Sequence, residues 1–174
     1  NMEDIVEIID GGTNPTGIYK WIKNYAAKNG RIEKISEFNQ IYIPNDENLI
    51  TIILVDHQSL IRKESGLSTK KEAIDKLSEY LQYARDFYGF SPVLVAQMNR
   101  DIANPAYQKM DTFEPTPEQI KDSGTSFEDS DICMSLFDPV KFKTSAPTKH
   151  DANKLIDMQT GAKYYRSLKI HKNS

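Results

Sequence analysis

An unbroken apolar run that ends in a carboxylate, Ile52 to Val55 followed by Asp56, constrains the fold of this chain most strongly. Four consecutive apolar residues predict a strand buried on both faces, as in a parallel sheet. Asp56 then stands at the carboxyl end of that strand, which is the edge where open α/β sheets bind ligands. A carboxylate at this edge can hold Mg²⁺ through water, usually together with phosphates. An aspartate that ends an apolar strand often only caps a turn, and the run alone does not favour the metal role.

The segment after this run predicts a helix and a second strand. Thr69 to Glu72 has the pattern of a capping box. Apolar residues then recur at helical spacing as far as Phe87, and Gly89 follows as a stop signal. A second apolar run, Pro92 to Ala96, leads to Gln97. Strand, helix and strand in this order predict a βαβ unit whose two strands are parallel neighbours.

The rest of the chain predicts further elements around this unit. Asn14 and Pro15 form a helix-start signal, and the apolar spacing that follows predicts a helix over residues 15–29. Met98 to Pro117 contains three prolines and little periodicity, which is typical of functional or mobile segments. The expected fold class is α/β, with a mostly parallel sheet flanked by helices. Further strands are predicted over residues 5–9, 38–43, 131–137 and 164–170.

The composition is typical of a soluble globular chain of about one domain. The 174 residues are 39% hydrophobic and 27% charged, and no apolar stretch reaches the length of a membrane span. The single cysteine, Cys133, excludes an internal disulfide and suits a reducing compartment. The three histidines show no metal-ligand spacing. A net charge of −3 leaves nucleic-acid binding open, because a basic patch can lie on an acidic domain.

Gln97 is the second polar residue at the end of a predicted strand, and Asn99 and Arg100 follow it. If the two strands are parallel, Asp56 and Gln97 face the same crevice. A glutamine in that place can hydrogen-bond a γ-phosphate or an attacking water, as in phosphoryl-transfer sites. It can as well bond the backbone of a loop, and the residue alone favours neither role.

Four segments, taken in order, resemble the motifs of DnaB-like replicative helicases. Leu54–Ile61 looks like the Walker B stretch, and Val93–Arg100 resembles the next motif, an apolar strand followed by Gln-x-Asn-Arg. Ile120–Met134 is similar to the fourth motif, with Lys-Asp-Ser-Gly ahead of an acidic cluster, and Leu168–Asn173 to the strand that leads to a Lys-Asn-Arg finger. The resemblance covers roughly residues 50–174 and implies a RecA-like core of the P-loop NTPase class.

The resemblance implies roles for three residues at the nucleotide. Asp56 would position Mg²⁺ through water, and Gln97 would sense the γ-phosphate of ATP. Lys172 would be the cation of the finger that reaches the phosphates of the neighbouring subunit in a homo-hexamer. The arginine expected two residues later falls on Ser174, so the finger is either shifted or absent, and a lysine lacks the planar fork of arginine.

The same resemblance implies contacts with single-stranded DNA. Arg100 would lie at the base of the first DNA-facing loop, residues 101–120. Lys121, Ser123 and Gly124 match the motif whose neighbourhood contacts the DNA backbone. Contacts of this kind give affinity without sequence choice. A primase and a helicase loader are the further partners that the resemblance implies.

The sequence departs from the family at the phosphate loop. The pattern Gly-x-x-x-x-Gly-Lys-Thr/Ser does not occur in it, and that loop carries most of the phosphate binding in the family. Residues 2–174 are therefore expected to be the C-terminal portion of a RecA-like helicase ATPase domain, inactive in isolation. The alternative is a free-standing, nucleotide-blind RecA-like module that binds protein or DNA. His57 and the opening Asn14–Lys20 resemble phage-encoded members. The resemblance to replicative helicases implies a protein of the bacterial cytoplasm, encoded by a bacterium or a phage.

Overall fold

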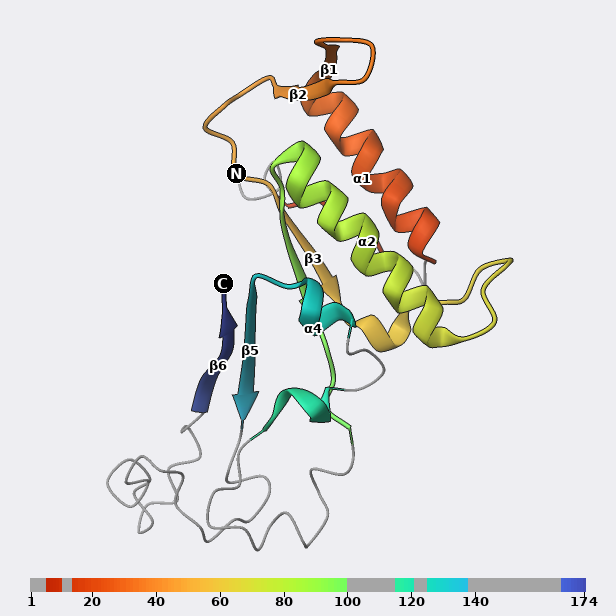
Figure 1. Cartoon of the computed structure of the whole chain (residues 1–174), viewed down its shortest axis with the longest axis vertical. Helices are drawn as coiled ribbons and strands as arrows, with labels where there is room; N and C mark the ends of the chain where they lie inside the picture. Colours follow the sequence, from red (N-terminus) through yellow and green to blue (C-terminus); the bar gives the residue numbers. More distant parts are fainter. Residues whose placement is uncertain (1–5, 11–13, 100–114, 121–124, 138–166) are drawn as a thin grey trace, which may run out of the picture. The chain divides into compact units, whose positions relative to one another are not determined.

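The computed structural model describes residues 6–10, 14–99, 115–120, 125–137 and 167–174. The chain divides into two compact units, Asn1–Val95 and Ala96–Ser174, and each is described by itself. Figure 1 labels the helices and strands in chain order. In the part of the chain that the structure describes, no helix is both long and apolar enough to cross a membrane.

The first unit is built on the predicted βαβ unit. It consists of β3 (Ile52–Asp56), α2 (Lys70–Tyr88) and β4 (Ser91–Val95). β3 and β4 are parallel neighbours, in a register that pairs the first residues of the two strands and pairs Asp56 with Val95. The predicted parallel pairing is therefore confirmed, and Asp56 lies at the carboxyl end of a parallel pair (Figure 1).

Both ends of α2 carry the caps that the sequence predicts. The Thr69 hydroxyl oxygen accepts the backbone N–H of Glu72 at 3.1 Å. The Glu72 carboxylate accepts the backbone N–H of Ser68 at 2.7 Å, and this hydrogen bond lowers the pKa of Glu72. Gly89 ends the helix with a φ of 71°, a left-handed conformation that glycine adopts without a Cβ clash. The two caps fix where the helix starts and where the chain turns into β4.

Thr69→Ala is expected to lower the free energy of unfolding by about 1 kcal/mol, because the N–H of Glu72 loses its acceptor. Urea unfolding followed by circular dichroism measures the loss. Ser68→Ala is the matched control, since Ser68 contributes its backbone N–H to the cap rather than its hydroxyl. Equal losses in the two variants would show that the Thr69 side chain does not cap α2.

The second helix of this unit, α1 (Pro15–Asn29), has the bounds that the sequence predicts. The side-chain oxygen of Asn14 accepts the N–H of Gly17 at 2.8 Å, and Pro15 occupies the first helical position. Proline is suited to this position because its missing N–H would have no partner within the helix.

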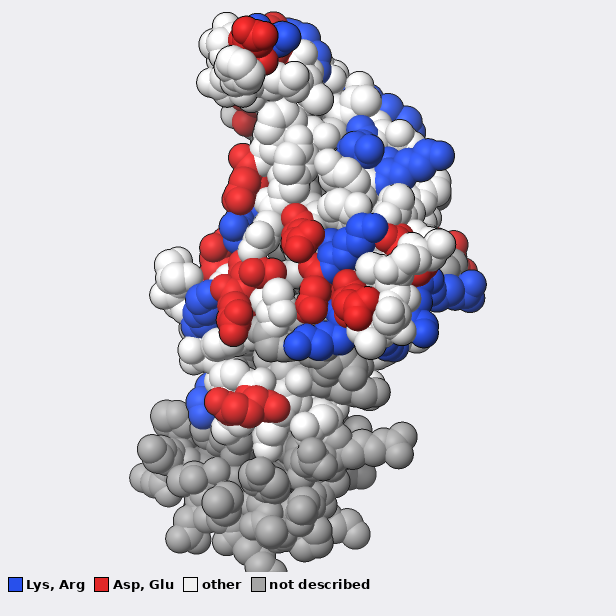
Figure 2. Space-filling view, turned by 45° about the vertical axis from the view of Figure 1, so that its right-hand side comes forward, with Lys and Arg blue, Asp and Glu red and all other residues white. Residues whose placement is uncertain are grey.

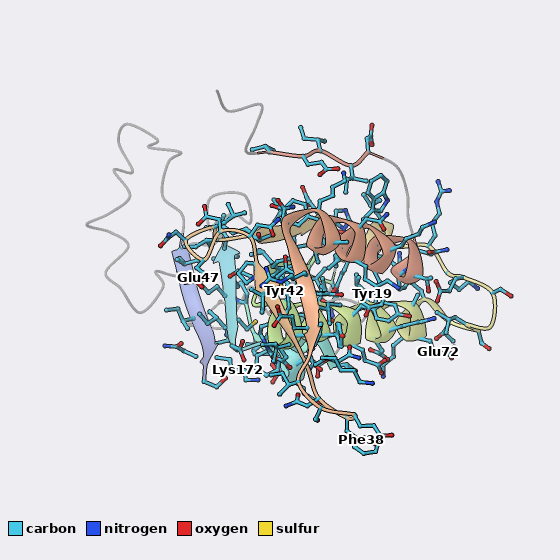
Figure 3. The ribbon with its side chains drawn as sticks, turned by 90° about the horizontal axis from the view of Figure 1, so that it is seen from above. Tyr19, Phe38, Tyr42, Glu47, Glu72 and Lys172 are labelled. Atoms are coloured by element: carbon cyan, nitrogen blue, oxygen red, sulfur yellow. The ribbon has the colours of Figure 1, made fainter. Side chains whose placement is uncertain are left out.

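A β-hairpin follows α1 directly. It pairs β1 (Gly30–Lys34) with β2 (Gln40–Pro44) in antiparallel register. The Tyr42 hydroxyl donates to the carbonyl of Ala26 at 3.0 Å and so ties β2 to α1. Phe38, at the end of the hairpin, is 94% exposed and points away from the ribbon in Figure 3. The sequence predicts β2 but not β1, because the stop signal of α1 coincides with the start of that strand.

The core of the first unit lies between the two helices and one face of the β3–β4 pair. α1 and α2 lie side by side in Figure 1. Ile53 and Val55 of β3 and Leu94 of β4 pack against them. The buried apolar residues are Ile22, Ala26, Ile61, Ala73, Ile74, Leu77, Leu81, Ala84, Tyr88 and Phe90.

The opposite face of the β3–β4 pair is exposed, which corrects the prediction of a strand buried on both faces. Ile52 and Leu54 are each 65% exposed, and Val93 and Val95 lie on the same exposed face. An apolar run of this kind is typical of a sheet covered on both sides, whereas both helices of this unit cover one side. The run therefore indicates a sheet face that the described part of the unit leaves bare.

The described residues of the second unit form two short helices and a strand pair. The strands β5 (Ile132–Phe137) and β6 (Ser167–Asn173) are antiparallel, and β5 confirms the strand predicted over residues 131–137. β6 confirms the part of the strand predicted over 164–170 that the structure describes, and it continues three residues beyond it. The elements of this unit are η4 (Pro117–Gln119), α4 (Thr125–Asp129), β5 (Ile132–Phe137) and β6 (Ser167–Asn173).

Two further predictions differ from the structure of the described residues. The described strands form three two-stranded sheets, and of these only β3–β4 is parallel, so a mostly parallel sheet is not what the described residues form. Residues 6–10 are exposed and form no strand, although 5–9 was predicted as one. An apolar run becomes a strand only where its backbone groups find partners, and residues 6–10 pair with no described strand. The fold class is mixed α/β.

Candidate functional site

Asp56 is the candidate metal-binding residue, and its side chain is exposed at the end of β3. Alternation along the strand turns Ile53 and Val55 toward the helices and leaves Asp56 on the other face with Ile52 and Leu54. Among the described residues, the Asp56 carboxylate has no hydrogen-bond or ion-pair partner. One exposed carboxylate at this edge fits Mg²⁺ held through water, because such an ion takes most of its ligands from water and phosphates.

A metal ion bound by protein side chains alone would need several ligands close together. Within the described ranges, no three His, Cys, Asp or Glu side chains lie close enough to hold an ion together. Asp56 offers one carboxylate at this edge, and Mg²⁺ that keeps its water ligands needs no more than one or two carboxylates from the protein.

The turn after Asp56 is fixed by its own hydrogen bonds. His57 Nδ1 accepts the N–H of Ser59 at 3.2 Å and starts η2 (Gln58–Leu60). The carbonyl of Ser59 accepts a hydrogen bond from the ammonium group of Lys70, at the start of α2. His57 and Lys70 therefore hold the turn that positions the Asp56 carboxylate.

Glu64 joins the segment after β3 to both helices. Its carboxylate accepts the N–H of Thr16 at 3.1 Å and the Thr16 hydroxyl at 3.0 Å, and it pairs with Lys76 of α2. Thr16 lies in the first turn of α1, where the helix dipole favours a negative charge. The hydrogen bond from Lys76, aided by those from Thr16, lowers the pKa of Glu64. Sequence reasoning missed this junction, because Thr16 and Glu64 are 48 residues apart and no local pattern links them.

Glu64→Gln is expected to lower the free energy of unfolding by about 1 kcal/mol at pH 7, since the amide keeps the shape but not the charge. The lowered pKa of Glu64 fixes the pH dependence. The stabilisation is complete above the ordinary carboxyl pKa of 4.5 and is lost as the pH falls through the lowered pKa of the folded chain. Urea unfolding at pH 7 and pH 3 should therefore show a difference between wild type and variant at pH 7 that shrinks at pH 3.

Glu37→Gln makes the same charge change at an exposed hairpin position and is the control. A Glu64→Gln effect that stays constant from pH 7 to pH 3, or that matches the Glu37→Gln effect, would contradict the role of the ionised Glu64 carboxylate.

Gln97 follows β4 by two residues, and its side chain is exposed. The next two residues are tied to a distant segment of the second unit. Met98 forms an antiparallel bridge with Ile120, and the N–H of Asn99 donates to the carbonyl of Gln119 at 2.7 Å. The structure thus brings together the end of the segment Val93–Arg100 and the start of the segment Ile120–Met134. The predicted DNA-facing loop, residues 101–120, connects these two segments.

Several of the sequence-based predictions stay predictions. Asp56 and Gln97 were predicted to face the same crevice. They belong to two units that are described separately, so this prediction is not tested. On the face shown in Figure 2, acidic and basic side chains of the described residues are intermixed and form no broad surface of one sign. The candidate DNA-binding residues lie outside the described ranges; they are Arg100, Lys121, Ser123 and Gly124.

Lys172, the candidate finger residue, is engaged within its own unit. Its ammonium group donates to the carbonyl of Glu128 at 2.7 Å and to that of Phe127 at 3.5 Å. It also lies 5.9 Å from the centre of the Phe127 ring. Both carbonyls belong to α4, so Lys172 holds this short helix to the end of β6. Ser174, where an arginine was expected, donates its N–H to the carbonyl of Asp131 at 3.0 Å.

Comparison with known proteins finds similarity at the level of structure. No protein-family model matches the sequence, and no curated protein does. Among solved structures, the chain is similar to a DnaB-like replicative helicase that was described together with its interactions with primase. The TM-score is 0.57 and the identity 15%, and the match covers 82% of this chain and 30% of the helicase chain.

This similarity bears on the fold alone. At 15% identity it shows a common fold with part of a DnaB-like helicase and does not by itself assign an activity. The chain spans about a third of the length of the helicase it matches.

Proposed function

We propose that these 174 residues are the C-terminal portion of the RecA-like motor domain of a DnaB-like replicative helicase. The intact motor couples hydrolysis of Mg·ATP to movement along single-stranded DNA and to duplex unwinding, as a homo-hexamer. The observation that carries the proposal is the placement of Asp56: an exposed carboxylate at the carboxyl end of a parallel strand pair, in a fold shared with such a helicase.

In this proposal the chain supplies two groups to the nucleotide in cis. The Asp56 carboxylate orients water ligands of Mg²⁺, and the Gln97 amide hydrogen-bonds the γ-phosphate or the attacking water. When bound, Mg²⁺ neutralises charge on the phosphates. The backbone tie between Asn99 and Gln119 connects Gln97 to the ends of the loop proposed to face DNA, so a change at the nucleotide can move that loop.

Lys172 acts in trans in this proposal, on the phosphates bound to the neighbouring subunit. To do so it leaves the carbonyls of Phe127 and Glu128 that it now contacts. Arg100, Lys121, Ser123 and Gly124 contact the backbone of single-stranded DNA, so binding is insensitive to base sequence. A primase and a helicase loader are the proposed protein partners of the intact motor.

The test uses the protein encoded by the complete reading frame. We expect it to contain the Gly-x-x-x-x-Gly-Lys phosphate loop, to hydrolyse ATP faster when single-stranded DNA is added, and to unwind a forked duplex only with ATP and Mg²⁺. A complete frame without the phosphate-loop lysine, or an ATPase rate that does not respond to DNA, would overturn the proposal.

A second candidate is a RecA-like module that binds protein or DNA without nucleotide. The observation that favours it is that the phosphate-loop pattern does not occur in these 174 residues. In that case Asp56→Ala should leave DNA and protein binding intact and ATP should have no effect on either, which separates this candidate from the motor.

A further inference from the structure

A cavity of about 400 Å³ opens in the first unit at the end of β3 away from Asp56. Thr51, the residue before β3, lines it, so about five residues of extended strand, roughly 17 Å, separate it from the Asp56 carboxylate. The cavity therefore differs from the proposed nucleotide edge and can be filled while that edge is occupied. Tyr42 and Glu47, which Figure 3 labels, come from β2 and from the segment that joins β2 to β3.

The charge of this cavity is negative. Glu47 and Asp86 line it, and no lysine or arginine is among the lining residues. The Asp86 carboxylate shares its charge with the neighbouring Arg85, at 2.8 Å. Glu47 is exposed and forms no hydrogen bond or ion pair within the described residues. The cavity thus presents one fully available carboxylate and one partly compensated carboxylate.

Two helices end at the same cavity. Asn29 and Tyr88 are the last residues of α1 and α2, and both line it. A helix carries partial negative charge at its C-terminus, which favours cations. The carbonyls of Lys28 and Asn29, at the end of α1, already accept hydrogen bonds from Asn45. The helix therefore attracts a cation through its dipole, and the carboxylates of Glu47 and Asp86 are the hydrogen-bond acceptors for it.

The walls of the cavity are aromatic. Tyr42 and Tyr88 meet edge to face with ring centres 5.1 Å apart, and Tyr88 stacks on Phe90 at 5.3 Å. Burial raises the pKa of Tyr88 to about 12, so its phenol is neutral at physiological pH. Neutral aromatic rings attract a cation placed over their faces, and the attraction is greater when the cation is shielded from water.

We propose that this cavity binds the side chain of an arginine carried by a partner protein. A planar guanidinium group stacks on aromatic rings and donates to a carboxylate at the same time, which a lysine ammonium cannot do as well. The volume lies in the range of small-ligand sites and leaves room for adjacent backbone. Leu49 and Ile50, 50% and 79% exposed beside the cavity, offer an apolar surface for the residues that flank the arginine.

The test is a titration of the ¹⁵N-labelled chain with a tripeptide of arginine between two leucines, blocked at both ends, followed by NMR. We expect saturable shifts of the Gly89 and Phe90 amides. The same peptide with neutral citrulline in place of arginine should bind at least about fivefold more weakly, and the lysine peptide should lie between the two.

Matched variants locate the binding site. Glu47→Gln should weaken binding of the arginine peptide by about fivefold, whereas Glu79→Gln, which makes the same charge change on the exposed face of α2, should leave it within about twofold. Equal binding of the arginine and citrulline peptides, shifts that map away from Gly89 and Phe90, or equal weakening by the two variants would overturn the proposal. So would the absence of shifts at millimolar peptide.

Discussion

Leu77→Ala is expected to lower the free energy of unfolding by about 3–4 kcal/mol, the largest loss of stability expected from a single substitution here. The Leu77 side chain is fully buried on α2, in the core that joins both helices to the β3–β4 pair. Removing its terminal atoms leaves a cavity that close-packed neighbours fill only in part. Urea unfolding followed by circular dichroism gives the change.

Leu60→Ala is the control for this substitution, because Leu60 is 62% exposed and the same atoms are removed from a site in contact with water. Its expected cost is below about 0.5 kcal/mol. Similar losses in the two variants would mean that the helices do not pack on the strand pair as described.

In the proposed motor, Asp56→Asn is expected to reduce ATP hydrolysis at least about 100-fold, because the carboxylate charge proposed to orient the Mg²⁺ shell is lost. The folded structure should not change, since the Asp56 side chain is exposed. Steady-state phosphate release with saturating single-stranded DNA measures the effect, and circular dichroism with thermal unfolding checks the fold.

Asp10→Asn, which makes the same chemical change at another exposed aspartate, is the matched control and should keep the wild-type rate. An Asp56→Asn variant with at least half of the wild-type rate would remove Asp56 from the site.

The βαβ unit could be predicted because its signals are local. The Thr69 cap, the apolar stripe of α2 and the left-handed Gly89 each lie within a few residues of the feature they specify. The two apolar runs on either side then fix the strands, and the short connections leave few topologies open. Asp56 at the carboxyl end of β3 followed from the same pattern.

Other features depend on contacts between distant residues and could not be predicted. Glu64 meets Thr16 across 48 residues, and nothing near either residue in the sequence indicates the other. β1 begins at Gly30, which is also the residue that ends α1, so the sequence around Gly30 indicates the end of a helix and not the start of a strand. The apolar pattern of β3 correctly indicates two apolar faces, but the pattern cannot say that both helices of the unit cover only one of them.

Calorimetry can test the proposal that the Asp56 carboxylate holds Mg²⁺ beside ATP. ATP binding to the intact motor would be measured with Mg²⁺ and with excess chelator, for the wild type and for Asp56→Ala. Mg²⁺ is expected to strengthen ATP binding by at least about tenfold in the wild type and by less than about twofold in the variant. An equal gain from Mg²⁺ in both proteins would contradict the proposal.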